Sequence, residues 1–141
     1  MKIILPMVSF SNLIMVDISV WHKEKQKLVN MLITCDTGAS VTTISNDLLQ
    51  RLGYETTAGI TKRITTASTV NYVKSVMVDK FVIGKSEKVQ LSDIEVYAHT
   101  FPEESFSSGV LGLNFFSMFD SVNFVFNKKV IEFTMDGEIY M

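Results

Sequence analysis

The sequence is poor in the features that mark several large classes of protein. A single cysteine among 141 residues excludes an internal disulfide framework and any zinc site built on cysteines. Lys and Arg number 13 against 15 Asp and Glu, so the net charge of −2 leaves no basic footprint for nucleic acid or for an anionic membrane surface. No apolar run reaches the roughly 20 residues that a membrane-spanning helix needs. We therefore expect neither a nucleic-acid partner nor a membrane.

The N-terminal segment is apolar, yet it does not predict a signal peptide. Pro6, Ser9, Ser11 and Asn12 interrupt the apolar run, and no small-x-small cleavage site follows before Trp21. The sequence also lacks an Asn-x-Ser/Thr acceptor for N-glycosylation. These absences agree with a cytoplasmic protein, and we expect that location.

The chain does contain enough apolar residues for one core, and they alternate with polar ones. A length of 141 residues and a hydrophobic content of 47% fit a single domain over residues 1–141. Alternation with period two is typical of half-buried strands. It predicts strands over Leu13–Trp21, Leu28–Cys35, Ile60–Thr66, Tyr72–Ile83, Val89–Ala98, Val122–Phe126 and Val130–Phe133.

Helical signals are few. Ser45 can cap a short helix over Asn46–Leu52, and Gly53 stands just past its end. Leu113–Phe119 is apolar enough to form a second, buried helix. The sequence therefore predicts an all-β, mostly antiparallel fold with one or two short helices.

The segment Met31–Ile44 has the sequence MLITCDTGASVTTI, in which an apolar strand runs straight into Asp36-Thr37-Gly38. The glycine permits a tight turn and the close approach of another backbone. We expect the apolar strand to shield the carboxylate from water. The same tripeptide is also a common turn after a strand, so alone it is weak evidence for a catalytic acid.

A second segment, GVLGLNFFSMFD over Gly109–Asp120, strengthens the interpretation. The two segments together resemble the retropepsin-like aspartic proteases, the single-domain homodimeric relatives of retroviral proteases. That family shows an apolar strand, Asp-Thr-Gly-Ala, a flap hairpin, and a hydrophobic–hydrophobic–Gly motif before a helix. This chain supplies Asp36-Thr37-Gly38-Ala39 and Val110-Leu111-Gly112 in that order. The resemblance covers roughly Val29 to Phe133 and implies a closed, β-barrel-like acid protease fold.

The resemblance implies an aspartic endopeptidase that acts on polypeptides as a homodimer, without a metal or another cofactor. Asp36 of each chain would supply half of a general acid/base pair that activates water, because two adjacent carboxylates share one proton. Val110, Leu111 and Gly112 would pack beneath the loop. They would hold the loop residues Thr37, Gly38 and Ala39 in place.

The resemblance also places a flap within Ile64–Val73, where Thr66, Ala67, Ser68 and Thr69 would contact substrate. The segment Ala67–Asn71 contains no glycine, unlike the flap tips of many relatives. An alternative hypothesis is therefore a proteolytically inactive β-rich dimerisation or peptide-binding module of the same fold. A third hypothesis is a monomeric β-barrel in which the tripeptide is only a turn. The terminal strands Met1–Phe10 and Ile131–Met141 would either build a dimer interface or cover a sheet edge.

Ala39 carries a further expectation. Family members with serine at this position place a hydroxyl near the catalytic carboxylate, where its hydrogen bond favours the charged form. Ala39 supplies no such donor, so we predict activity that extends toward neutral pH.

Two other residue types suggest chemistry less strongly. Cys35 lies on an apolar strand without a histidine partner, so we expect a buried small residue and not a nucleophile. His22 and His99 are far apart in sequence, which gives no reason to predict a metal site. We expect His99 to lie in a loop or at a sheet edge.

Overall fold

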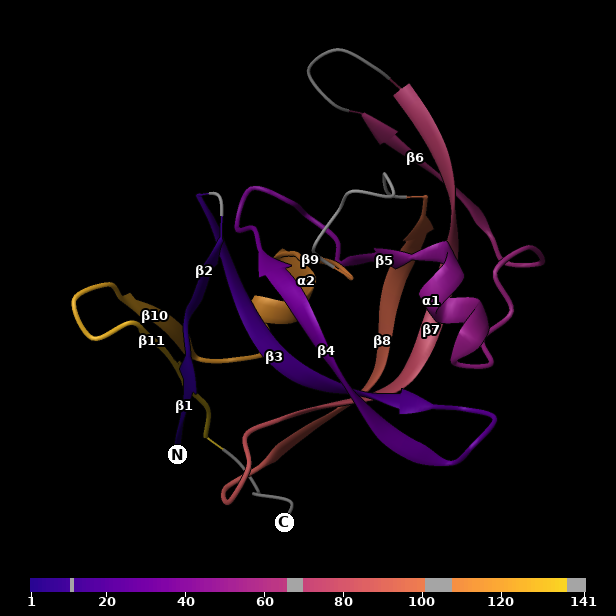
Figure 1. Ribbon diagram of the computed structural model, residues 1–141. Coiled ribbons are helices and arrows are strands. Elements are labelled where there is room, and N and C mark those ends of the chain that lie inside the picture. Colours follow the sequence, from indigo (N-terminus) through magenta and orange to yellow (C-terminus); the bar gives the residue numbers. More distant parts are fainter. Residues whose placement is uncertain (11, 66–69, 101–107, 137–141) are drawn as a thin grey trace.

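Strands dominate the computed structural model, which describes residues 1–10, 12–65, 70–100 and 108–136. Short helices interrupt the strands at two places in these residues (Figure 1). In chain order the elements are β1 (Lys2–Pro6), β2 (Val8–Phe10), β3 (Leu13–His22), β4 (Lys27–Cys35), β5 (Thr43–Ser45), α1 (Asn46–Arg51), β6 (Thr61–Thr65), β7 (Val70–Ile83), β8 (Val89–His99), β9 (Gly109–Leu111), α2 (Leu113–Phe116), β10 (Ser121–Val125) and β11 (Val130–Thr134). The expectation of an all-β fold with short helices is confirmed.

The larger sheet has eight strands in the order β2-β3-β4-β9-β5-β8-β7-β6. Most neighbours are antiparallel, but β4 pairs with β9 and β5 pairs with β8 in parallel. Strand β3 also pairs with β7, through Ser19 opposite Val82 and Val20 opposite Phe81, so the sheet curls back on itself. The β6–β7 hairpin projects beyond the rest of the molecule (Figure 1).

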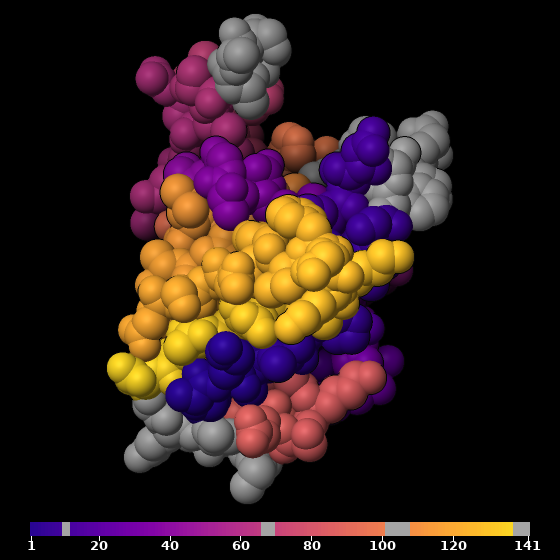
Figure 2. Space-filling model, turned by 90° about the vertical axis from the view of Figure 1, so that its left-hand side faces the viewer, coloured from indigo at the N-terminus to yellow at the C-terminus, as the bar shows by residue number. Residues whose placement is uncertain are grey.

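The smaller sheet brings the two ends of the chain together in the order β1-β11-β10. Figure 2 shows this sheet at the surface, with the β10–β11 hairpin in yellow, β1 in indigo and the orange segment of α2 beside them. In the turn between β10 and β11, Lys129 adopts the left-handed conformation, with φ of 54°.

Both short helices form where the sequence predicts them, and both end earlier than expected. Helix α1 begins after Ser45, whose Oγ accepts a hydrogen bond from Leu48 N at 3.4 Å, and Gly53 follows its end with φ of 90°. Helix α2 ends at Phe116, and the chain then forms tight turns up to Phe119. None of the helices in the described ranges is long and apolar enough to cross a membrane.

A series of phenylalanine rings connects the two sheets through α2. Phe115 is fully buried, and its ring centroid lies 6.0 Å from that of Phe81 on β7 and 5.7 Å from that of Phe119. Phe119 in turn lies 5.0 Å from Phe133 on β11. The chain turns tightly after Phe116, so that the ring of Phe119 lies between those of Phe115 and Phe133. Packing of large rings thus fixes α2 between the sheets.

We predict that Phe115→Ala lowers the free energy of unfolding by about 3–5 kcal/mol, because the site at the centre of these rings cannot collapse around the lost side chain. Urea denaturation measures the change. Met77→Ala is the matched control, since Met77 is 54% exposed and its loss should change stability by less than about 1 kcal/mol. Equal effects of the two substitutions would contradict the assignment of Phe115 to the core.

Candidate functional site

Asp36 begins a tight loop directly after β4. Its backbone N–H donates to Leu111 O at 3.0 Å, which extends the parallel pairing of β4 with β9 by one more bond. Its side-chain Oδ1 accepts from Gly38 N at 2.9 Å, and its carbonyl accepts from Ala39 N at 3.1 Å. Two hydrogen bonds inside the loop and one to β9 therefore fix where the carboxylate points.

The carboxylate is open to solvent in the single chain. Asp36, Thr37 and Gly38 are all exposed, and Ala39 is half-buried. The expectation that the preceding strand shields Asp36 from water is therefore wrong for one protomer. Side chains alternate along a strand, so the burial of Ile33 on β4 does not extend to the loop that follows.

The residues expected to support this loop lie against it. Leu111 is fully buried, and Gly112 packs so closely that an added Cβ would stand 2.6 Å from Val41 C and 2.9 Å from Ala39 O. Both contacts are with backbone atoms, which cannot move aside as a flexible side chain could. The structure thus brings Val110, Leu111 and Gly112 together with the Asp36 loop.

Sequence reasoning missed one residue of this support, Asn114. Its Oδ1 accepts hydrogen bonds from both Thr42 N, at 2.7 Å, and Thr42 Oγ1, at 2.8 Å. Its Nδ2 donates to Glu95 O on β8 at 2.8 Å. Thr42 is fully buried, and its Oγ1 also accepts from Gly112 N at 3.1 Å. One amide therefore ties α2 to the segment after the loop and to β8.

The backbone of α2 adds two more bonds to the same loop. Leu113 N donates to Ala39 O at 2.8 Å, and Asn114 N donates to Ser40 O at 3.2 Å. The signal that could have identified Asn114 is its polar side chain inside the apolar run LGLNFF, since a buried amide needs partners.

Cys35 stands next to Asp36 but does not offer a second nucleophile. Burial of its thiol raises the pKa to about 12, because the thiolate would be poorly solvated there. At neutral pH the side chain is therefore a neutral thiol, as a structural residue on β4 would be.

The remaining predicted residues fall into two groups. Thr66, Ala67, Ser68 and Thr69, expected to contact substrate from the flap, lie outside the described residues, although strands β6 and β7 on either side of them form the projecting hairpin. His99 is the last residue of β8 and half-buried. It was expected in a loop or at a sheet edge, and that expectation is wrong, because β8 lies between β5 and β7 and His99 pairs with Ser45. In the described ranges, no group of three or more His, Cys, Asp or Glu side chains could hold a metal ion.

We predict that Gly112→Ala destabilises the protein by about 1–3 kcal/mol, because the new methyl group would overlap backbone atoms of Val41 and Ala39. Urea denaturation gives the stability, and backbone amide NMR shifts report movement of the loop. Ser117→Ala serves as the control, since Ser117 is exposed just after α2. Unchanged amide shifts at Ala39 and Val41 would contradict the close packing.

Comparison with known proteins supports this geometry. A family model described as "Aspartyl protease" matches residues 18–115, which include the Asp36 loop and its support. No curated protein sequence shows significant similarity to the chain.

Among solved structures, a retropepsin-like aspartic protease from Rickettsia conorii is similar in fold. The TM-score is 0.68 at 19% sequence identity, and the match covers 96% of this chain and 91% of the other. The family match spans the Asp36 loop and both segments that support it, and the overall fold is retropepsin-like, so the chain belongs to the aspartyl protease family.

Proposed function

We propose that the protein is an aspartic endopeptidase that hydrolyses peptide bonds as a homodimer, with one Asp36 from each protomer. The observation that carries this proposal is the Asp36 carboxylate, which is exposed to solvent yet held in place by its loop. Family membership supports a peptidase. The sequence contains one Asp-Thr-Gly, so a pair of such carboxylates needs a second copy of the chain.

The chemistry follows from bringing the two carboxylates close together. At about 3 Å, both cannot be ionised, so the pair holds one shared proton. The ionised member takes a proton from a water molecule, which attacks the carbonyl carbon of the substrate. The protonated member donates a hydrogen bond to the carbonyl oxygen, and a proton then passes to the leaving amine. No covalent bond to the enzyme forms in this sequence of steps.

The rigid loop is what makes this chemistry efficient. Its hydrogen bonds to Leu111, Leu113 and Asn114 hold Asp36 without reorganisation during the reaction. Gly38 leaves room for a substrate backbone beside the carboxylate, since an added Cβ would stand 3.2 Å from Asp36 Oδ1. The projecting β6–β7 hairpin offers backbone groups that could pair with an extended peptide.

We place the dimer interface on the face drawn in Figure 2. Large apolar side chains are exposed on α2, its following turn and the β10–β11 turn: Leu113 at 48%, Met118 at 38% and Phe126 at 65%. Leu113 is next to the Asp36 loop, because its N–H bonds to Ala39 O. Strand β11 is flanked by β1 and β10 of its own chain, so the edges of this sheet that could face a partner are β1 and β10.

We predict that Asp36→Asn lowers the rate of cleavage of an unfolded protein substrate by about a thousandfold or more, because the amide cannot accept a proton from water. Gel electrophoresis or mass spectrometry of the products measures the rate. Asp93→Asn is a matched control, since Asp93 is exposed and adopts φ of 54°, which asparagine tolerates. Equal cleavage by the wild-type and Asp36→Asn proteins would remove Asp36 from the mechanism.

The same variant tests the dimer. Excess Asp36→Asn protein, mixed with the wild type, should suppress wild-type activity, because most active chains then pair with an inactive one. Sedimentation should give twice the mass of one chain at the assay concentration. Tight peptide binding without any cleavage by the wild type would instead favour the binding-module hypothesis.

We predict that Ala39→Ser moves the pH dependence of kcat/KM toward acid, by about half a pH unit or more. Activity needs one proton on the carboxylate pair, and a hydroxyl donor stabilises the ionised form, so the pair loses that proton at lower pH. Steady-state rates from about pH 3 to pH 8 measure the profile. A wild-type profile confined to strongly acidic pH, or an alkaline shift in the variant, would contradict the role given to Ala39.

A further inference from the structure

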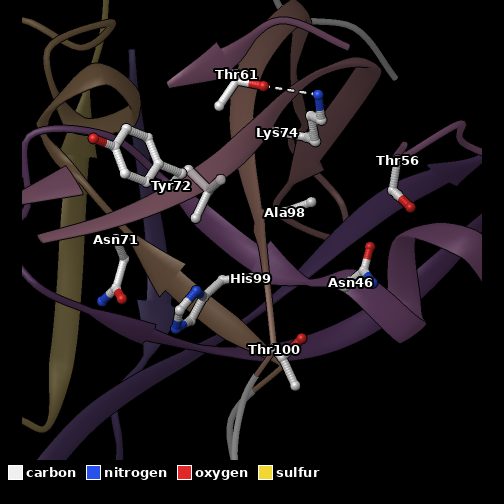
Figure 3. A pocket seen from close by; sticks show the side chains of 10 residues that line it. Asn46, Thr56, Thr61, Asn71, Tyr72, Lys74, Ala98, His99 and Thr100 are labelled. Carbon is white, nitrogen blue, oxygen red and sulfur yellow. Dashed lines mark hydrogen bonds between the residues drawn. The ribbon is translucent and has the colours of Figure 1, made fainter. Parts of the chain in front are cut away.

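A cavity of about 440 Å³ lies between the base of the β6–β7 hairpin and the end of β8. Figure 3 shows Lys74 and Thr61 at one side of it, His99 and Thr100 at the other, and Ala98 between them. Asn46, the first residue of α1, adds an amide to the wall. The cavity thus lies between the hairpin, the start of α1 and the end of β8, and β8 pairs with β5, which follows the Asp36 loop in the chain.

Lys74 occupies a position that continues the buried face of β7. Val76 and Val78 follow it on the same face and are buried, and Lys74 pairs with Ala98, which is buried too. Lys74 therefore places an ammonium group at the end of this row of apolar side chains. The Nζ atom donates to Thr61 Oγ1 at 2.7 Å and the side chain is half-buried.

Lys74 is the only lysine or arginine among the described residues that line the cavity. Lys74 makes no ion pair within the described part of the chain, and the described lining residues include no carboxylate. Strand β6 of the same hairpin also contains Lys62 and Arg63. Threonine hydroxyls and the Asn46 amide add neutral hydrogen-bonding groups. A lysine without a carboxylate partner among the described residues favours an anionic group from outside the chain.

We propose that this cavity is a substrate subsite that receives an acidic side chain, Asp or Glu, of the polypeptide. The proposal rests on the proposed function, since it assumes that a peptide binds below the hairpin. An extended peptide directs alternate side chains to the same side, at intervals of about 6.6 Å, so one side chain can enter the cavity while the backbone passes the carboxylate pair. Two-fold symmetry supplies one such cavity on each side of the scissile bond.

The test uses the full-length protein and a mixture of random-sequence decapeptides. Mass spectrometry of the products maps each cleaved bond and the residues around it. Asp and Glu should be enriched by about threefold to tenfold at one position on each side of the bond, as expected for a partly exposed charge pair. Lys74→Glu should exchange this preference for Lys and Arg, and Lys74→Met should remove it.

Two controls keep the test decisive. Lys80→Met, on the same strand but outside the cavity, should keep the acidic preference, and thermal unfolding shows whether each variant is folded. In a second arm, immobilised Asp36→Asn protein retains peptides from the same mixture, with and without Lys74→Glu. Acidic peptides should be retained, and the added Lys74→Glu should reverse that selection.

The outcomes separate the two proposals. Acid-selective binding that depends on Lys74, without cleavage by the wild type, would overturn the proposed peptidase and support the subsite. Cleavage with no acidic preference at any position, or a preference that survives Lys74→Glu, would overturn the subsite. Failure of the immobilised protein to retain any acidic peptide, together with no cleavage, would overturn it as well.

Discussion

The backbone of Gly109–Asn114 is the constraint on which the candidate site depends. It pairs in parallel with β4, bonds to Asp36 through Leu111 O, and bonds to Ala39 and Ser40 through the first turn of α2. Gly112 allows this close approach, because any side chain there would overlap the backbone of Val41. A loop held by so many backbone contacts keeps its carboxylate in one orientation, which an acid/base catalyst requires.

Packing in the hydrophobic core holds this backbone segment against both sheets. Phe115 packs against Phe81 on the large sheet, and Phe119 packs against Phe133 on the small one, so α2 is fixed from both sides. Asn114 lies on the same short helix and adds polar contacts to Thr42 and to β8. Rigidity at the site is therefore a consequence of packing beyond the site.

In the proposed peptidase, the rigid Asp36 loop and the projecting β6–β7 hairpin have different roles. The loop presents one carboxylate, and the second must come from another chain. The β6–β7 hairpin would hold the peptide, with Lys74 at its base selecting an acidic side chain. A cytoplasmic location and a single-domain organisation over residues 1–141 remain predictions of the sequence.

The sequence predicted the elements well because local patterns carry that information. Alternation gave the strands, Ser45 and Gly53 marked the ends of α1, and the motifs at Asp36 and Gly112 pointed to one site. Errors arose where tertiary contacts decide, as at Asp36, which was expected to be shielded by the preceding strand and is exposed.

By itself, then, the sequence determined the longer strands, the two short helices and the short motif that could hold a catalytic acid. Only the tertiary structure decided that β9 lies beside β4, that Asn114 bonds to Thr42, and that Lys74 lines a cavity. The physical reason is that alternation depends on neighbours along the chain. Pairing of distant strands depends instead on how the whole chain buries its apolar surface and satisfies its backbone hydrogen bonds.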